Sequence, residues 1–150
     1  MIKNKNKFIF YLILILVVYG VYCAVTIGKN WDSFFFINIG KERLSYLLSF
    51  GQRALDEHYV AKMYPGIYNT LSAFFLSIFP NNFELEGYHL LNFTTSFFAA
   101  VGLYKLTKKI FNNECAILAF FIFFLNPIFF GHMAINDRDT VVIFSNIWIT

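Results

Sequence analysis

A carboxylate stands shortly after the first apolar stretch of the chain, at Asp32 within Trp31-Asp32-Ser33. Held at a membrane surface, such a carboxylate can act as a general base toward a hydroxyl or an amine. Asp also caps helices, because its side chain accepts hydrogen bonds from the free N–H groups of the first turn. Local sequence alone favours the cap, but the two roles are compatible.

A second group of charged residues, Asp137, Arg138 and Asp139, stands between two apolar stretches. The guanidinium of Arg suits bidentate contact with a phosphate, and the acids could ligate a divalent cation or orient a reacting group. His132, just before them, could hydrogen-bond a phosphate or a sugar. The alternatives are solvated helix ends or caps for the charged residues, and a structural or interfacial role for the histidine.

Other patterns that suggest sites are weaker. Asp56-Glu57-His58-Tyr59 resembles a metal-ligand cluster, but it lacks the spacing of zinc proteases and adjacent residues on a helix diverge. A solvated loop is therefore expected there, and no metal site is predicted. Asn92-Phe93-Thr94 fits a glycosylation sequon but lies in an apolar run. The sequence contains no Walker loop, no glycine-rich dinucleotide turn and no nucleophile elbow.

The composition excludes several classes of protein. Hydrophobic residues make up 58% of the chain, charged residues make up 14%, and the mean hydropathy is +0.57. In soluble domains, hydrophobic residues average about 45–50% and charged residues about 25%. A chain of 150 residues cannot hide this excess in one core, which predicts a membrane protein. No basic cluster interleaved with aromatics accompanies the net charge of +3, so no nucleic-acid partner is predicted.

The first membrane-spanning helix is predicted at 8–25, where an apolar run follows Lys3, Lys5 and Lys7. A helix of that length extends about 27 Å at about 1.5 Å per residue, close to the hydrocarbon thickness of about 30 Å. A secretory signal peptide is the alternative. It is disfavoured because the run is long and Val21-Tyr22-Cys23-Ala24 is a poor cleavage site.

The segment 26–89 is predicted to be a long external loop that holds two helices lying in the headgroup plane. In the first, 34–50, apolar residues recur at three- and four-residue spacing opposite a charged face, which is typical of an interfacial amphipathic helix. The second, 64–79, is apolar but interrupted by polar residues, and it closes at Pro80. An interfacial or re-entrant helix is therefore expected rather than a span.

Further spans are predicted at 90–104, 115–130 and 140–150, which gives about four in an all-α fold. Asn126-Pro127 should kink or end the third. Lysines before the first span and at 105–109 favour the cytoplasmic side. This rule places the N-terminus in the cytoplasm and both 26–89 and the turn 131–139 outside. Because the last apolar run is still in progress at Thr150, we expect the N-terminal piece of a longer protein, inactive by itself.

Several of these motifs occur in the same order in a known family. The motifs that carry the resemblance are Trp31-Asp32, Tyr64-Pro65-Gly66-Ile67-Tyr68, Asn126-Pro127-Ile128-Phe129-Phe130-Gly131-His132 and Asn136-Asp137-Arg138-Asp139. The arrangement resembles the N-terminal third of GT-C type membrane glycosyltransferases, of the protein mannosyltransferase and lipid A aminoarabinose transferase group. The resemblance covers essentially the whole chain and is strongest from Phe129 to Asp139.

The resemblance implies transfer of a sugar, with inversion, from a polyprenyl-phosphate-linked donor to a lipid, glycan or protein acceptor. The reaction would take place at the outer face of a bacterial inner membrane. Asp32 matches the first-loop catalytic aspartate, with Ser33 where the family has a second acid. Asp139 matches the aspartate of an Asn-Pro-Lys-Asp motif, in which Asp137 and Arg138 replace Pro and Lys.

Asp32 and Asp139 are accordingly the expected catalytic residues, with Asp32 as the base. Arg138, His132 and Asp137 are the expected substrate- and phosphate-binding residues. No cofactor is implied beyond a divalent cation that the acids could hold, and membrane lipids are the remaining expected partners. Two other classes of function stay open: a transporter or flippase, in which charges line a pathway, and a non-catalytic membrane subunit.

Overall fold

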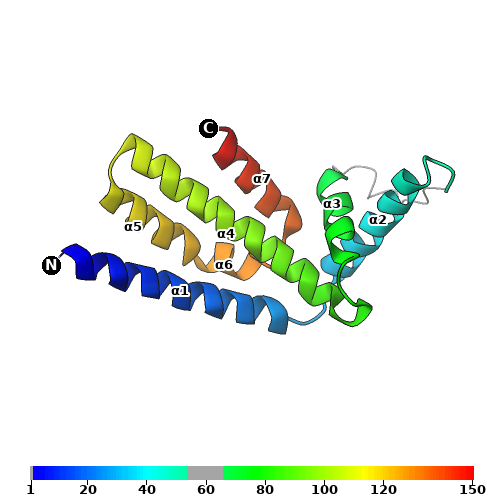
Figure 1. The fold of residues 1–150 in the computed structure, drawn as a ribbon, viewed down its shortest axis with the longest axis horizontal. Coiled ribbons are helices and arrows are strands. Elements are labelled where there is room, and N and C mark those ends of the chain that lie inside the picture. Colours follow the sequence, from blue (N-terminus) through cyan, green and yellow to red (C-terminus); the bar gives the residue numbers. More distant parts are fainter. Residues whose placement is uncertain (1, 54–65) are drawn as a thin grey trace.

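The computed structural model describes residues 2–53 and 66–150, and within them the chain is helical with no strand (Figure 1). This confirms the all-α prediction. The elements in order are α1 (Ile2–Thr26), α2 (Trp31–Leu48), α3 (Ile67–Leu76), the 3₁₀ turn η2 (Asn81–Phe83), α4 (Glu84–Ile110), α5 (Asn113–Phe124), α6 (Pro127–His132) and α7 (Asp137–Ile149).

Helix α4 is the centre of a bundle in which α1, α5 and α7 each pack along it (Figure 1). Gly20, late in α1, faces the ring of Phe93, early in α4, so these two helices run in opposite directions. The indole of Trp148 in α7 donates a 3.1 Å hydrogen bond to the carbonyl of Phe98. The bundle core is apolar and consists of Ala24, Phe93, Ala100, Phe120, Phe124, Met133 and Ala134.

One helix of the described residues is long and apolar enough to cross a membrane, the segment Lys7–Thr26 of α1. Its 20 residues extend about 30 Å, and large apolar side chains such as Phe8 and Ile15 are exposed along it. The predicted span 90–104 falls within α4, and the predicted span 140–150 coincides with α7 up to Ile149.

Helices α2 and α3 pack on each other and lie across the end of the bundle where α1 finishes (Figure 1). They correspond to the predicted helices 34–50 and 64–79; Tyr64 and Pro65 lie outside the described residues. The two helices approach each other closely at Gly40, where a Cβ atom would meet the backbone carbonyl oxygen of Asn69. A second core, formed by Phe36, Ile37, Ile39, Leu76 and Tyr88, joins this pair to α4.

The predicted break in the third apolar run is confirmed. Helix α5 ends at Phe124, and α6 begins at Pro127, capped by Asn126, whose side chain accepts from the N–H groups of Ile128 and Phe129. The chain leaves the helix again after α6, at the buried residues Met133 and Ala134, whose carbonyls need donors. Two α4 side chains supply them through 3.1 Å hydrogen bonds: Asn92 Nδ2 donates to Ala134, and Ser96 Oγ donates to Met133.

Candidate functional site

The start of α2 and the turn between α6 and α7 enclose a polar pocket of about 350 Å³. Asp32 enters it from α2, His132 from the end of α6, and Asp137, Arg138 and Asp139 from the first turn of α7. The lining residues are Asn30, Trp31, Asp32, His132, Ile135, Asn136, Asp137, Arg138 and Asp139. All five residues that sequence analysis singled out for catalysis or binding therefore line one pocket, which we call the polar pocket.

Asp32 does not cap α2, so the cap prediction is wrong. The N-cap is Asn30, whose extended backbone lets its side-chain oxygen accept a 2.6 Å hydrogen bond from the N–H of Ser33. Asp32 already lies in the first helical turn and is exposed. Its negative charge suits the helix N-terminus, and the residue lines the polar pocket.

Asp137 is buried, which contradicts the interpretation of this residue as a solvated helix end. Its side chain is 4% exposed, and its Oδ2 accepts a 2.8 Å hydrogen bond from the hydroxyl of Tyr88. Burial raises the pKa of Asp137, against the opposing effects of the Tyr88 hydrogen bond and the Arg138 charge. Burial also raises the pKa of Tyr88, and the nearby Asp137 carboxylate raises it further. The N-cap of α7 is Asn136.

Arg138 is held between α7 and α2. Its guanidinium carbon lies 4.4 Å from the centre of the Phe36 ring, a cation–π arrangement that orients the planar donors. Asp139 is exposed, and its Oδ2 accepts a 2.7 Å hydrogen bond from the Asn136 amide. His132 is exposed at the last turn of α6. The pocket thus combines one oriented cation with two exposed carboxylates.

A larger cavity of about 940 Å³ adjoins the polar pocket, and we call it the apolar cavity. The two share Asp137, Arg138 and Asp139 in their linings. The hydrophobic side chains that line the apolar cavity come from α2, α3, α4 and α7 and are Phe36, Ile67, Leu71, Phe98, Val141, Val142, Phe144 and Trp148. Three charged residues therefore lie at the boundary between the polar pocket and the apolar cavity.

Sequence analysis missed a row of buried polar side chains along α4 behind this site. His89 Nε2 lies 3.1 Å from Ser33 Oγ, and Asn92 Oδ1 accepts a 2.6 Å hydrogen bond from Tyr68. Burial lowers the pKa of His89, although the backbone of Ala24 acts in the opposite direction. His89, Asn92 and Ser96 follow one another at three- and four-residue spacing, which places them on one face of a helix. That spacing is the signal in the sequence that could have revealed this row of polar residues.

Within residues 2–53 and 66–150, no three His, Cys, Asp or Glu side chains converge in a way that could hold a metal ion. Asp56-Glu57-His58-Tyr59 lies outside the described residues. No family model, curated protein or solved structure matches this chain. Function is therefore inferred from the chemistry of the site.

Proposed function

We propose that the protein is a polytopic membrane glycosyltransferase. It moves a sugar from a polyprenyl-phosphate-linked donor to a lipid, glycan or protein acceptor at the outer face of a bacterial inner membrane. The observation that carries the proposal is the contact between two unlike spaces: the polar pocket and the apolar cavity meet at Asp137, Arg138 and Asp139. A ligand with a charged head and a long hydrocarbon chain would fill both.

The donor fits this division. Its isoprenoid chain would occupy the apolar cavity of about 940 Å³, and its phosphate would lie against Arg138, whose planar guanidinium suits bidentate contact with phosphate oxygens. The leaving group is an acidic phosphate, so it requires cationic stabilisation rather than a proton. His132, on the rim of the polar pocket, would hydrogen-bond the phosphate or the sugar.

The acceptor would bind from the opposite side of the polar pocket. Asp32 is exposed and lines that pocket, so it is the candidate base for the attacking hydroxyl or amine. Asp139, also exposed, would orient the acceptor. Asp137 has a different role from the binding role expected of it: buried against Tyr88, it would hold the turn that carries Arg138.

The proposed topology has four crossings, and two observations support it. The bundle helices alternate in direction around α4, since α1 and α5 run against it and α7 runs with it (Figure 1). In addition, α5 and α6, with the break between them, run from Asn113 to His132, and a stretch of about 20 residues would reach across a bilayer core. The lysine-rich N-terminus would then be cytoplasmic, and the polar pocket would open outside.

Deletion of the gene in the source bacterium tests the proposal. Without the enzyme, a polyprenyl-phosphate-linked sugar should accumulate in lipid extracts analysed by mass spectrometry, and the wild-type gene should remove it. Asp32→Asn should fail to remove it at normal expression, because loss of a general base costs about 10²- to 10⁴-fold in rate. Glu42→Gln is the matched control, since Glu42 is an exposed acid of α2 that does not line the polar pocket.

Normal clearance of the sugar lipid by Asp32→Asn would refute the base assignment. An unchanged sugar-lipid pool in the deletion strain would refute the transfer reaction itself. If membrane vesicles then accumulated a solute in a protein-dependent manner without a polyprenyl donor, a transporter would be the better description.

A further inference from the structure

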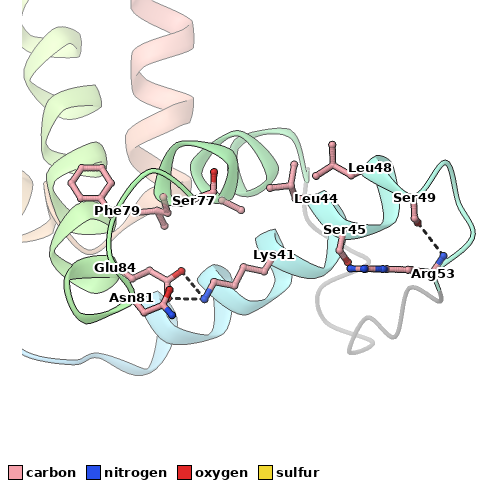
Figure 2. Close-up of a pocket in the computed structure, with 12 residues that line it drawn as sticks. Lys41, Leu44, Ser45, Leu48, Ser49, Arg53, Ser77, Phe79, Asn81 and Glu84 are labelled. Atoms are coloured by element: carbon pink, nitrogen blue, oxygen red, sulfur yellow. Dashed lines mark hydrogen bonds and ion pairs between the residues drawn. The ribbon is translucent and has the colours of Figure 1, made fainter.

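A separate cleft of about 530 Å³ lies between α2 and the segment from α3 to the start of α4 (Figure 2). Among the residues that the structure describes, it shares no lining residue with the polar pocket or the apolar cavity. Buried Ala73 and Leu76 and half-buried Leu44 give it an apolar floor. Leu48 and Phe79 also line it. The polar side chains of the lining are Lys41, Ser45, Ser49, Arg53, Ser77, Asn81 and Glu84.

The cleft carries an excess positive charge. At one end, Lys41 Nζ lies 2.6 and 2.7 Å from the two carboxylate oxygens of Glu84, so these charges neutralise each other (Figure 2). At the other end, the Arg53 side chain reaches back along α2 toward Ser45 (Figure 2). Among the described residues, no carboxylate forms an ion pair with Arg53. An anion would therefore be attracted to the Arg53 end.

Exposed apolar side chains occur at and next to the cleft lining. Leu48, which lines the cleft, is 70% exposed. Phe50 and Ile78 follow the lining residues Ser49 and Ser77 in the chain and are 96% and 73% exposed. A soluble surface rarely gathers such groups beside a cation, whereas proteins that lie at the headgroup level of a bilayer combine the two. The α2–α3 pair also lies at the end of the bundle where α1 finishes (Figure 1), which is the level of the headgroups if α1 crosses the membrane.

We propose that this cleft binds the headgroup of an anionic phospholipid, with phosphatidylglycerol as the best fit. The phosphate would lie against Arg53, and the glycerol hydroxyls would hydrogen-bond Ser45, Ser77 and Asn81. The first methylenes of the acyl chains would cover Leu44 and Leu76. The bound lipid would hold the α2–α3 pair at a fixed depth. The inference rests on the proposed membrane crossing of α1 and not on the transfer reaction.

The test uses the protein purified from membranes in detergent and delipidated. It is mixed with equal amounts of phosphatidylglycerol and phosphatidylcholine with identical acyl chains, and bound lipid is counted by native mass spectrometry. The wild type should retain phosphatidylglycerol preferentially. Arg53→Gln should lower its apparent affinity about tenfold, a reasonable loss for one charge-assisted contact, while phosphatidylcholine binding stays the same. Arg53→Lys should recover part of the affinity.

Lys29→Gln is the matched control, because it removes one exposed positive charge from the link before α2 and outside the cleft. An equal loss with Lys29→Gln and Arg53→Gln would overturn the proposal in favour of general charge attraction. Displacement of the lipid by millimolar inorganic phosphate would also overturn it, because the site would then recognise phosphate rather than a lipid. Neither measurement depends on sugar transfer, so a failure here is distinct from a failure of the proposed function.

Discussion

The hydroxyl of Tyr88 in α4 donates a 2.8 Å hydrogen bond to Oδ2 of Asp137 at the start of α7, and both side chains are buried. This contact fixes the turn from which Arg138 and Asp139 enter the polar pocket. A buried carboxylate requires such a donor, because its desolvation is otherwise uncompensated. The position of the candidate phosphate-binding group thus depends on a residue from a different helix.

Removal of the Tyr88 hydroxyl should weaken both the fold and the site. Tyr88→Phe leaves the Asp137 carboxyl with one hydrogen bond fewer, at a cost of about 1–3 kcal/mol in the free energy of unfolding. Thermal unfolding in detergent measures this loss. Tyr104→Phe is the control, since the Tyr104 hydroxyl bonds to exposed Asn113 and should cost less. Equal losses for both variants would contradict the special role of the buried pair.

Titration of Asp137 should make stability fall as pH rises. Burial raises its pKa above the ordinary value of 3.8, so the folded protein holds the proton more tightly than the unfolded chain. The free energy of unfolding therefore declines as the pH rises from about the ordinary pKa of Asp137 through its raised pKa in the folded protein. Asp137→Asn removes the titrating group and should flatten this decline, as measured by unfolding at a series of pH values. An unchanged slope in the variant would show that other groups cause it.

The cap of α2 should matter for activity as well as for stability. Asn30→Ala removes the side-chain acceptor of the Ser33 N–H, which costs about 1 kcal/mol and loosens the turn that presents Asp32. Clearance of the lipid-linked sugar in the deletion strain should slow, and Asn30→Ser, which keeps a capping oxygen, should restore most of it. Equal activities for the Ala and Ser variants would show that the cap does not position Asp32.

Any side chain at Gly40 should push α2 and α3 apart. A Cβ atom there would meet the backbone oxygen of Asn69 and would lie 3.2 Å from the Cβ of Ala73. Gly40→Ala should therefore destabilise the protein by about 1–3 kcal/mol, as overpacking does. Gly131→Ala is the control, because nothing lies within 4 Å of its added Cβ. A neutral Gly40→Ala would mean that the two helices separate without cost.

Local sequence was enough to predict the features that depend on neighbouring residues. The apolar run after Lys7 predicted α1, and Asn126-Pro127 predicted the break between α5 and α6, since proline and its preceding residue restrict the backbone directly. The five residues that the sequence motifs indicate as a site also line one pocket. Their functional roles stay predictions.

Long-range contacts account for what the sequence could not predict. Asp137 looked like a solvated helix end because its donor, Tyr88, lies far away in the chain and comes near it only through helix packing. Asp32 looked like the N-cap because Asp and Asn cap almost equally well, and the extended backbone at Asn30 decided between them. Asn92 resembled a sequon, whereas both ends of its amide are engaged inside the bundle.

The hydrogen bonds from Asn92 and Ser96 to the chain beyond α6 have a consequence for biogenesis. Met133 and Ala134 are buried in the folded protein, and their carbonyls need donors because an unpaired buried polar group is costly. Their donors belong to α4, which is synthesised first and can already be in place when α5 and α6 leave the ribosome. The order of the helices along the chain thus matches the order in which these two contacts can form.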